Sequence, residues 1–347
     1  MAFTFITRKI RFHQTLQRKT GVILMKPNLF NYATSELSQD AFLLWLLEWA
    51  NPSNSEYDLE LYKTASDFLR KIIDVDEKFD IKSVVCKKQQ YHIDVLAIVN
   101  DKIAVIIEDK INTQEHGNQI ARYRQQLETA LGTQYDIKCI YLKTGNECLT
   151  KLRENADKGN FKIFMRQDLL KILDKSNSDN TILKDFVLKI KEVEECSNQY
   201  KSKPYHEWMQ NGFAWQGFYS WLEDNLGDYI EWRYVSNPNG GFWGCYWHWK
   251  WCKAFNFTIY LQIEQNRICF KADNKPNIDC IKKCQEEIFS IALEKNLKLE
   301  KSRFHRGNYV TICFVDTSYL FDKGFFEEKE ILAKISNLTK IIDSIAD

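Results

Sequence analysis

Three charged side chains stand at the ends of two apolar runs in YHIDVLAIVNDKIAVIIEDK, residues 91–110. Asp94 interrupts the first run, and the second run ends on Glu108 and Lys110. Side chains alternate across a strand, so Glu108 and Lys110 are expected to project from one face. A tight turn at Asn100-Asp101 would set the hairpin register so that Asp94 stands beside them. The pattern therefore predicts two carboxylates and an ammonium at one sheet edge.

This donor set suits metal-assisted chemistry. Carboxylate oxygens are ligands for Mg²⁺, which keeps several waters and accepts substrate phosphate oxygens. In phosphodiester hydrolysis such an ion neutralises the charge growing on the phosphate and acidifies its bound water. Lys110 fits beside it as a compact point charge with a movable pKa, which can position that water and stabilise its deprotonated form.

The alternative is that Asp94, Glu108 and Lys110 only solvate a sheet edge and pair with one another. Acids buried at strand ends without a partner or a metal cost on the order of several kcal/mol. That cost, together with the pattern around these residues, favours a metal site.

The surrounding sequence predicts the elements that would hold these side chains. SELSQDAFLLWLLEWA, residues 35–50, is apolar on nearly every face, which is typical of a buried helix with Ser38 as N-cap. The other expected elements are a helix over 59–74, extended segments over 80–87, 90–99 and 102–109, a helix over 113–131 with capping-box spacing at Asn112 and Glu115, a strand over 137–142, the strand-to-helix piece FKIFMRQDLLKIL, and a helix over 181–196.

These motifs carry a resemblance to a known family. Asp94 followed by Glu108-Asp109-Lys110 resembles the D…(D/E)xK signature of the PD-(D/E)XK nuclease superfamily, and Gln119-Ile120-Ala121-Arg122-Tyr123 resembles the QxxxY motif of some of its branches. SELSQDAFLLWLL is similar to the first helix of a bacterial branch, in which Glu36 matches an acidic position that completes the site. No proline precedes the aspartate, since the chain reads His92-Ile93-Asp94. The resemblance covers about residues 28–180.

The resemblance implies a restriction-endonuclease-like αβββαβ core of α/β class with a mixed central sheet. It implies that Asp94 and Glu108 hold Mg²⁺, with Mn²⁺ as a possible substitute, together with the backbone carbonyl of Asp109. It also gives Glu36 a place in the metal site. The alternative for Glu36 is a helix N-terminal charge that suits the macrodipole.

The same resemblance assigns a substrate-positioning role to the helix after the hairpin. Gln119 and Tyr123 lie one turn apart on one face, which would point to the site and the substrate backbone; the alternative is a plain amphipathic helix. His116 would touch phosphate. The implied function is a metal-dependent nuclease that hydrolyses nucleic-acid phosphodiester bonds, in DNA rather than RNA. The alternative is a catalytically silent module of the same fold that binds nucleic acid or a protein partner.

Composition limits the remaining classes. A formal net charge of +1 over 347 residues argues against a protein that binds nucleic acid through its overall positive charge. An anionic partner must therefore be bound at a local site. Ten cysteines form no CxxC pair, which favours reduced thiols in a cytoplasmic protein. The sequence has no apolar run long enough for a membrane span, and its N-terminus lacks the apolar core of a signal peptide. Composition does not predict an oligomeric state.

Changes in pattern along the chain predict its domains. We expect an N-terminal arm over 1–24, a nuclease-like domain over 25–196 and a linker over 197–206. We expect residues 207–347 to form an aromatic-rich, smaller α+β domain with an antiparallel sheet, which would serve substrate or partner recognition.

The aromatic residues of this second domain alternate with polar ones. Trp247, Trp249 and Trp251 continue the odd register of Phe257 and Ile259, which favours a core role over a base-stacking platform. On the even face Tyr246, His248 and Lys250 are open to a ligand or to solvent, and so is the basic group Lys298, Lys301, Arg303, His305 and Arg306; solvated surface is favoured for both.

Overall fold

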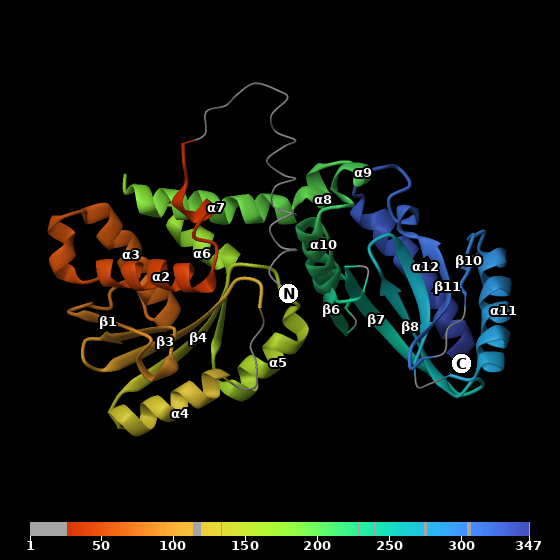
Figure 1. Cartoon of the computed structure of the whole chain (residues 1–347), viewed down its shortest axis with the longest axis horizontal. Helices are drawn as coiled ribbons and strands as arrows, with labels where there is room; N and C mark the ends of the chain where they lie inside the picture. Colours follow the sequence, from red (N-terminus) through yellow and green to blue (C-terminus); the bar gives the residue numbers. More distant parts are fainter. Residues whose placement is uncertain are drawn as a thin grey trace.

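The computed structural model describes residues 26–113, 119–132, 134–227, 229–238, 240–273, 276–303 and 307–346. Two β-sheets, each with its own helices, make up the molecule, and the long helix α7, Thr181–Ser197, runs from one to the other (Figure 1). This mixed sheet followed by a second, antiparallel sheet confirms the fold class expected from the sequence. Residues 1–24 and His116 lie outside the described residues.

The first sheet has five strands in the order β1-β2-β3-β4-β5. The first three strands pair antiparallel, and β4 and β5 run parallel to β3, as in a βαβ unit. The strands are β1 Val84–Lys88, β2 Val95–Val99, β3 Ile103–Lys110, β4 Asp136–Lys143 and β5 Lys162–Met165.

The turn between β2 and β3 sets the register of this sheet. Asn100 and Asp101 both adopt positive φ, 53° and 55°, which is the conformation of a two-residue type I′ hairpin. The resulting pairs run from Val99↔Ile103 to Val95↔Ile107. Continuing this register by one residue brings Asp94 opposite Glu108.

Helices cover both faces of the five-stranded sheet and form two cores. In β2 and β3, odd-numbered residues such as Val95, Val105 and Ile107 pack with α2, α3, α6 and α7, whereas even-numbered ones such as Leu96 and Ile106 pack with α4 and α5. The helices are α2 Glu36–Trp49, α3 Leu59–Ile73, α4 Gln119–Leu131, α5 Leu149–Gly159 and α6 Arg166–Leu173. The strands read as near-continuous apolar runs because both faces are buried.

Local signals explain where some of these helices begin. The N-cap of α2 is Ser35, whose side chain accepts a hydrogen bond from the Ser38 backbone, so the expected cap at Ser38 is wrong by one turn. The expected capping box at Asn112 and Glu115 lies partly outside the described residues. Helix α5 was not expected, because its buried face consists of only Leu152 and Ala156.

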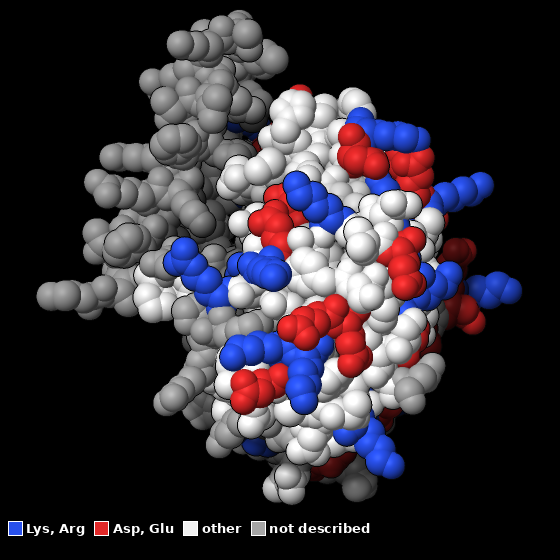
Figure 2. All heavy atoms as spheres, turned by 90° about the vertical axis from the view of Figure 1, so that its right-hand side faces the viewer, with Lys and Arg blue, Asp and Glu red and all other residues white. Residues whose placement is uncertain are grey.

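The second sheet has six antiparallel strands in the order β10-β11-β9-β8-β7-β6. Helices α10 Gly212–Asn225, α11 Ile278–Glu294 and α12 Glu328–Ala346 share one core with its inner face. The strands are β6 Ile230–Val235, β7 Phe242–Cys252, β8 Phe257–Ile263, β9 Arg267–Ala272, β10 Glu300–Lys301 and β11 Val310–Asp316. On the side of the molecule nearest α11, Lys and Arg are interspersed with Asp and Glu (Figure 2).

A β-bulge in β7 overturns part of the sequence prediction for this sheet. The register with β8 shifts between Trp247 and Lys250, and His248 adopts φ 61° within the shift. Trp247 is fully buried as expected, but Trp251 is 52% exposed and Trp249 stacks on Tyr260. One extra residue exchanges the faces of the side chains that follow it in β7, so the odd-position core pattern ends at Trp247 in this strand. In β8, Phe257 and Ile259 are fully buried as expected.

The two sheets are joined through α7 and α10. A Cβ at Gly217 of α10 would lie 2.0 Å from the Ser197 carbonyl oxygen at the end of α7, so only glycine allows this approach. The segment expected to be a linker contains the short helix α8 Gln199–Ser202 and the start of α9 Tyr205–Trp208, and Tyr200 is buried in the second core. The domain boundaries themselves stay a prediction. No helix among the described residues has the length and apolar character needed to cross a lipid bilayer.

Candidate active site

Glu108 and Lys110 end strand β3 on the face covered by α4. Glu108 is completely buried, Lys110 is 7% exposed, and the Lys110 ammonium forms an ion pair with Glu108 Oε1. Asp94 directly precedes β2 and lies half-buried in the position opposite Glu108. The antiparallel register therefore brings the three residues to one edge of the sheet, on the same face.

Negative charge exceeds positive charge at this edge. Burial raises the pKa of Glu108 to about 6, against the opposing hydrogen bond from Lys110. Burial also raises the pKa of Asp94, which the Lys110 charge only partly offsets. Burial works to lower the pKa of Lys110, yet its hydrogen bond to Glu108 and the nearby carboxylates raise it, so the ammonium stays charged. Glu108 Oε2 is buried and has no hydrogen-bond partner among the described residues.

Glu36 reaches the same region from the first turn of α2. Its Oε1 accepts hydrogen bonds from the Ile111 backbone at 3.0 Å and from the Thr113 hydroxyl at 2.6 Å. Burial opposes ionisation, but these two bonds and the Lys110 charge lower the pKa of Glu36. Glu36 thus fixes the chain that leaves β3 immediately after Lys110.

Asp109 points to the opposite face of the sheet, as alternation requires. Its side chain is fully buried, and Oδ1 accepts a hydrogen bond from Gln39 of α2 at 2.5 Å. Burial raises the pKa of Asp109 well above its ordinary value. The role of its backbone carbonyl in metal binding stays a prediction.

Gln119 and Tyr123 lie on the first turns of α4, over the Glu108 face. The Gln119 amide donates to the Tyr123 hydroxyl at 2.6 Å. Burial raises the pKa of Tyr123, and the charges of Glu108 and Asp94 act in the same direction, so the phenol lies within electrostatic reach of both acids. The sequence motif and the strand-end acids therefore share one side of the sheet.

Asp40 belongs to this cluster but was not singled out in the sequence. It is 6% exposed, and burial followed by the charge of Asp94 raises its pKa to about 7. Its Oδ1 is buried without a hydrogen-bond partner in the described part of the chain. The available signal was its spacing from Glu36, one helical turn earlier on α2, which places both on one helix face.

Lys143 is a second lysine at this edge that the sequence reading missed. It ends β4 directly beside Lys110 in the parallel register, is 1% exposed, and lies 3.4 Å from Glu147. Glu147 also accepts a hydrogen bond from Tyr141 at 2.6 Å. Burial lowers the pKa of Lys143, against the charge of Glu147. The available signal was its place at the end of an apolar strand, like that of Lys110.

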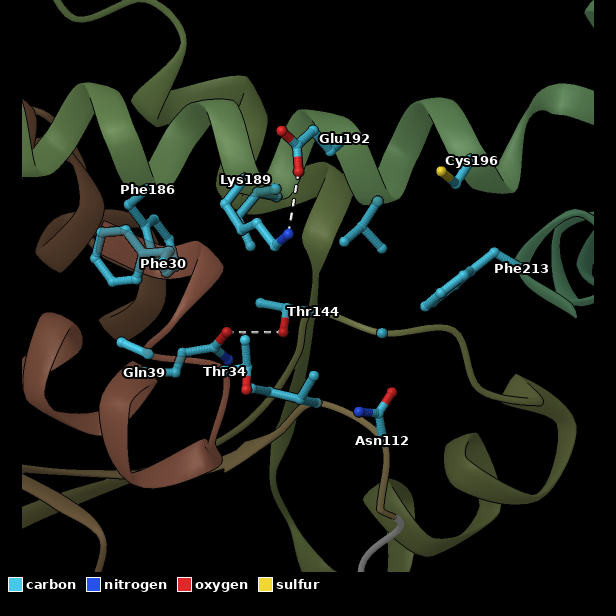
Figure 3. A pocket seen from close by; sticks show the side chains of 15 residues that line it. Phe30, Thr34, Gln39, Asn112, Thr144, Phe186, Lys189, Glu192, Cys196 and Phe213 are labelled. Atoms are coloured by element: carbon cyan, nitrogen blue, oxygen red, sulfur yellow. Dashed lines mark hydrogen bonds and ion pairs between the residues drawn. The ribbon is translucent and has the colours of Figure 1, made fainter. Parts of the chain in front are cut away.

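An apolar cavity of about 360 Å³ lies behind Asp109, between α7 and the start of α2. Phe30, Phe186 and Phe213 contribute to its walls, and Gln39 hydrogen-bonds Thr144 on its floor (Figure 3). Its lining includes neither Glu108 nor Lys110. The cavity therefore lies on the Asp109 side of β3 and does not open on the acids at the Glu108 face.

Comparison with known protein families gives a match for the first sheet and its helices. A family model described as the PD-(D/E)XK nuclease superfamily matches residues 27–202, about half of the chain. The chain belongs to the PD-(D/E)XK nuclease superfamily. Neither the curated proteins nor the solved structures contain a match to it. The matched region begins before α2 and ends with α8, and the match supports a nuclease-type function.

PD-(D/E)XK nucleases generally use divalent metal ions, and the residues present fit such an ion. Asp94, Glu108 and Asp40 supply hard carboxylate oxygens, and two of those oxygens are buried without hydrogen-bond partners among the described residues. Within the same described ranges no three His, Cys, Asp or Glu side chains are grouped closely enough to hold a metal by themselves.

Proposed function

We propose that this chain is a metal-dependent nuclease that hydrolyses phosphodiester bonds of DNA at the Asp94–Glu108–Lys110 edge. The observation that supports this most is the meeting of two carboxylates and a lysine from neighbouring strands, covered by Gln119 and Tyr123 of α4. Family membership makes nucleic acid the substrate class. DNA, rather than RNA, is proposed from the resemblance of the motifs.

Each residue has a separate task in this proposal. Asp94 and Glu108 would hold the ion, which would be Mg²⁺ or in its place Mn²⁺, with help from the Asp109 carbonyl. The bound ion would neutralise charge on the scissile phosphate and acidify the attacking water. The Glu108 carboxylate keeps Lys110 protonated, so its ammonium would orient the attacking water and stabilise the negative charge that develops on it.

The α2 acids support the same edge. Glu36 fixes Ile111 and Thr113, which holds the end of β3 in place. Its carboxylate, together with Asp40, is also available to a second ion. Gln119 and Tyr123 offer an amide and a phenol to the strand backbone, and we propose that His116 adds a phosphate contact.

A substrate panel tests this proposal. The parent chain is incubated with circular and linear DNA, single- and double-stranded, and with RNA of the same sequence, each with Mg²⁺, with Mn²⁺ or with EDTA. Cleavage of DNA with Mg²⁺ and none with EDTA is expected. Cleavage of RNA alone would contradict the substrate assignment. Nucleic-acid binding without products in every arm would instead identify a silent binding module.

A further inference from the structure

The outer face of the six-stranded sheet, opposite the core with α10–α12, carries a cavity of about 680 Å³. Its volume falls within the roughly 300–1,000 Å³ typical of small-molecule sites. It lies outside the residues matched by the nuclease family and outside the Asp94–Glu108–Lys110 edge. Its walls combine aromatic rings with charged side chains, notably Arg233, Tyr246, Trp249, Tyr260, Gln262 and Glu264.

The β7 bulge places the principal aromatic of this cavity. His248 and Trp249 together oppose Tyr260 of β8, and the extra residue turns Trp249 to the outer face. Trp249 stacks on Tyr260 with ring centroids 5.9 Å apart and planes 22° from parallel. Bulges are over-represented beside functional sites, where they re-aim a side chain. Without the bulge, alternation would send Trp249 into the core beside Trp247.

The floor of the cavity is polar and ordered. Gln262 and Glu264 are 4% and 7% exposed, and the Gln262 amide donates to Glu264 at 2.8 Å. Arg267 donates to the other Glu264 oxygen at 2.7 Å, and Lys271 lies 3.5 Å from the first. An aromatic wall over a fixed amide and carboxylate offers a π-surface and hydrogen-bonding groups to the edge of a flat polar ring.

Charges on the lining balance. Arg233, Arg267 and Lys271 face Glu231, Glu264 and Asp273. Glu264 already engages Arg267 and Lys271, whereas Arg233 is exposed and lies over the Tyr246 ring at 5.6 Å. A lining of zero net charge suits a ligand held by stacking and ring-edge contacts, with at most one or two phosphates, and does not suit the backbone of a long duplex.

A second cavity adjoins this one where α5 approaches β6. Glu231 and Arg233 line both cavities, and the second cavity, of about 250 Å³, extends to Glu147 and Lys151. Glu147 is the ion-pair partner of Lys143 at the end of β4. In this arrangement a strand whose base sits on Trp249 would pass Arg233 and Lys151 on its way toward the Lys143 end of β4.

We propose that the outer-face cavity binds one unpaired nucleobase of the substrate strand, stacked on Trp249 and read by Gln262, with Arg233 on its phosphate. This inference rests on the proposed function, because the nuclease site makes nucleic acid the partner. It deepens that function by requiring an extruded or single-stranded base at a fixed distance from the scissile bond.

Binding in EDTA, where the strand is not cut, tests the cavity separately from catalysis. Fluorescence anisotropy compares a labelled single-stranded oligonucleotide, the same strand fully paired, and a strand of abasic sites of equal length. The single strand is expected to bind at least tenfold more tightly than the abasic strand and the duplex. Equal affinity for all three would overturn the proposal.

Variants locate the binding. Trp249→Ala is expected to weaken single-strand binding at least tenfold, consistent with a base–aromatic stack, and Trp249→Phe is expected to restore most of it. The matched control is Trp251→Ala, which removes an exposed tryptophan from the same strand outside the cavity lining. Parent-like binding by Trp249→Ala would contradict the assignment.

Arg233→Ala keeps the test valid if Trp249→Ala fails to fold. Arg233 is exposed, so its removal leaves the core intact. It is expected to weaken binding and to reduce the salt dependence by about one phosphate equivalent, since each phosphate contact of a single strand contributes a slope of about −0.7. An unchanged affinity and salt slope would overturn the Arg233 contact and, with it, the path to the nuclease edge.

Two further outcomes separate this inference from the proposed function and from another occupant. Cleavage with Mg²⁺ by the parent, combined with base-independent binding in EDTA, would overturn the cavity and leave the nuclease standing. Base-dependent binding without cleavage of any substrate would overturn the nuclease function and leave the cavity assignment standing. A trimethyl-lysine peptide that binds in a Trp249-dependent way, while the oligonucleotide does not, would show a protein-tail cage and overturn the nucleobase proposal.

Discussion

The two sheets of this molecule position the side chains of their proposed sites in different ways. In the five-stranded sheet, β2 and β3 alternate without interruption, and the type I′ turn at Asn100-Asp101 brings Asp94 opposite Glu108. In the six-stranded sheet, a bulge at His248 breaks the alternation and turns Trp249 outward onto Tyr260. Regular register gathers charged groups at a strand end, whereas a broken register delivers an aromatic ring to a sheet face.

This difference explains what the sequence could predict. The grouping of Asp94, Glu108 and Lys110 could be predicted, because period-two alternation and a two-residue turn depend only on local sequence. The bulge could not be predicted, because a histidine with positive φ has no sequence signature. The partner of the His248 ring, Asp343, is 2.8 Å away in the fold but lies on α12, far away in the sequence. Trp249 and Trp251 were therefore assigned to the wrong face.

Long-range partners account for the other omissions. Asp40 joins the acid cluster only because α2 packs across β2 and β3, and Lys143 joins it only through the parallel β3–β4 register. Helix α5 has too few apolar positions to show helical periodicity. The fold class, the order of the main elements and the charged strand ends followed from the sequence, whereas the packing that completes the acid cluster did not.

The largest expected effect comes from removing a strand-end acid from the regular sheet. Asp94→Asn should lower the cleavage rate by about 1,000-fold or more, since a metal site supplies several kcal/mol of transition-state stabilisation. The melting temperature should be unchanged or slightly higher, because burial already disfavours the charge of Asp94. Initial rates and melting curves are compared with Asp136→Asn, an exposed acid at the opposite end of β4. Full activity in Asp94→Asn would show that the regular register of the five-stranded sheet does not assemble a catalytic site.

The junction between the sheets gives the next largest effect. Gly217→Ala places a methyl group 2.0 Å from the Ser197 carbonyl oxygen, and either α7 or α10 must move. Overpacking of this kind costs about 1–3 kcal/mol, measured as the free energy of unfolding in urea. Gly307→Ala is the control, since its added methyl group would lie 3.6 Å from the Tyr309 carbonyl oxygen, an ordinary van der Waals contact. A parent-like midpoint in Gly217→Ala would show that the α7–α10 contact is not a tight one.

A smaller effect is expected from the helix that covers the acids. Tyr123→Phe removes the hydroxyl that accepts from Gln119, and with it about 1 kcal/mol of positioning energy. Cleavage should fall about fivefold, with binding of uncut strand nearly unchanged. Tyr135→Phe, outside α4, is the control. A loss as large as that of Asp94→Asn would mean that Tyr123 takes part in the chemistry directly and does not merely position the strand.

The smallest effect is a change in pH dependence. The pKa values of Asp40 and Glu108 in the fold, about 7 and about 6, lie above those of the unfolded chain. Between about pH 4 and pH 7 the fold therefore binds more protons than the unfolded chain, and its stability in metal-free buffer falls as pH rises. Asp40→Asn should flatten this decline. Chemical denaturation of both proteins at several pH values measures it, and identical slopes would rule out Asp40 as a proton-binding group.

Cleavage by Lys110→Ala tests the central claim most directly. With saturating Mg²⁺ and the substrate that the parent cuts, single-turnover cleavage by Lys110→Ala should fall below detection, while strand binding persists and Lys138→Ala cuts like the parent. Lys138 carries the matched charge on β4, away from the Glu108 edge, and pairs with exposed Asp136. Cleavage by Lys110→Ala at the parental rate would contradict the assignment of the Asp94–Glu108–Lys110 edge as the catalytic site.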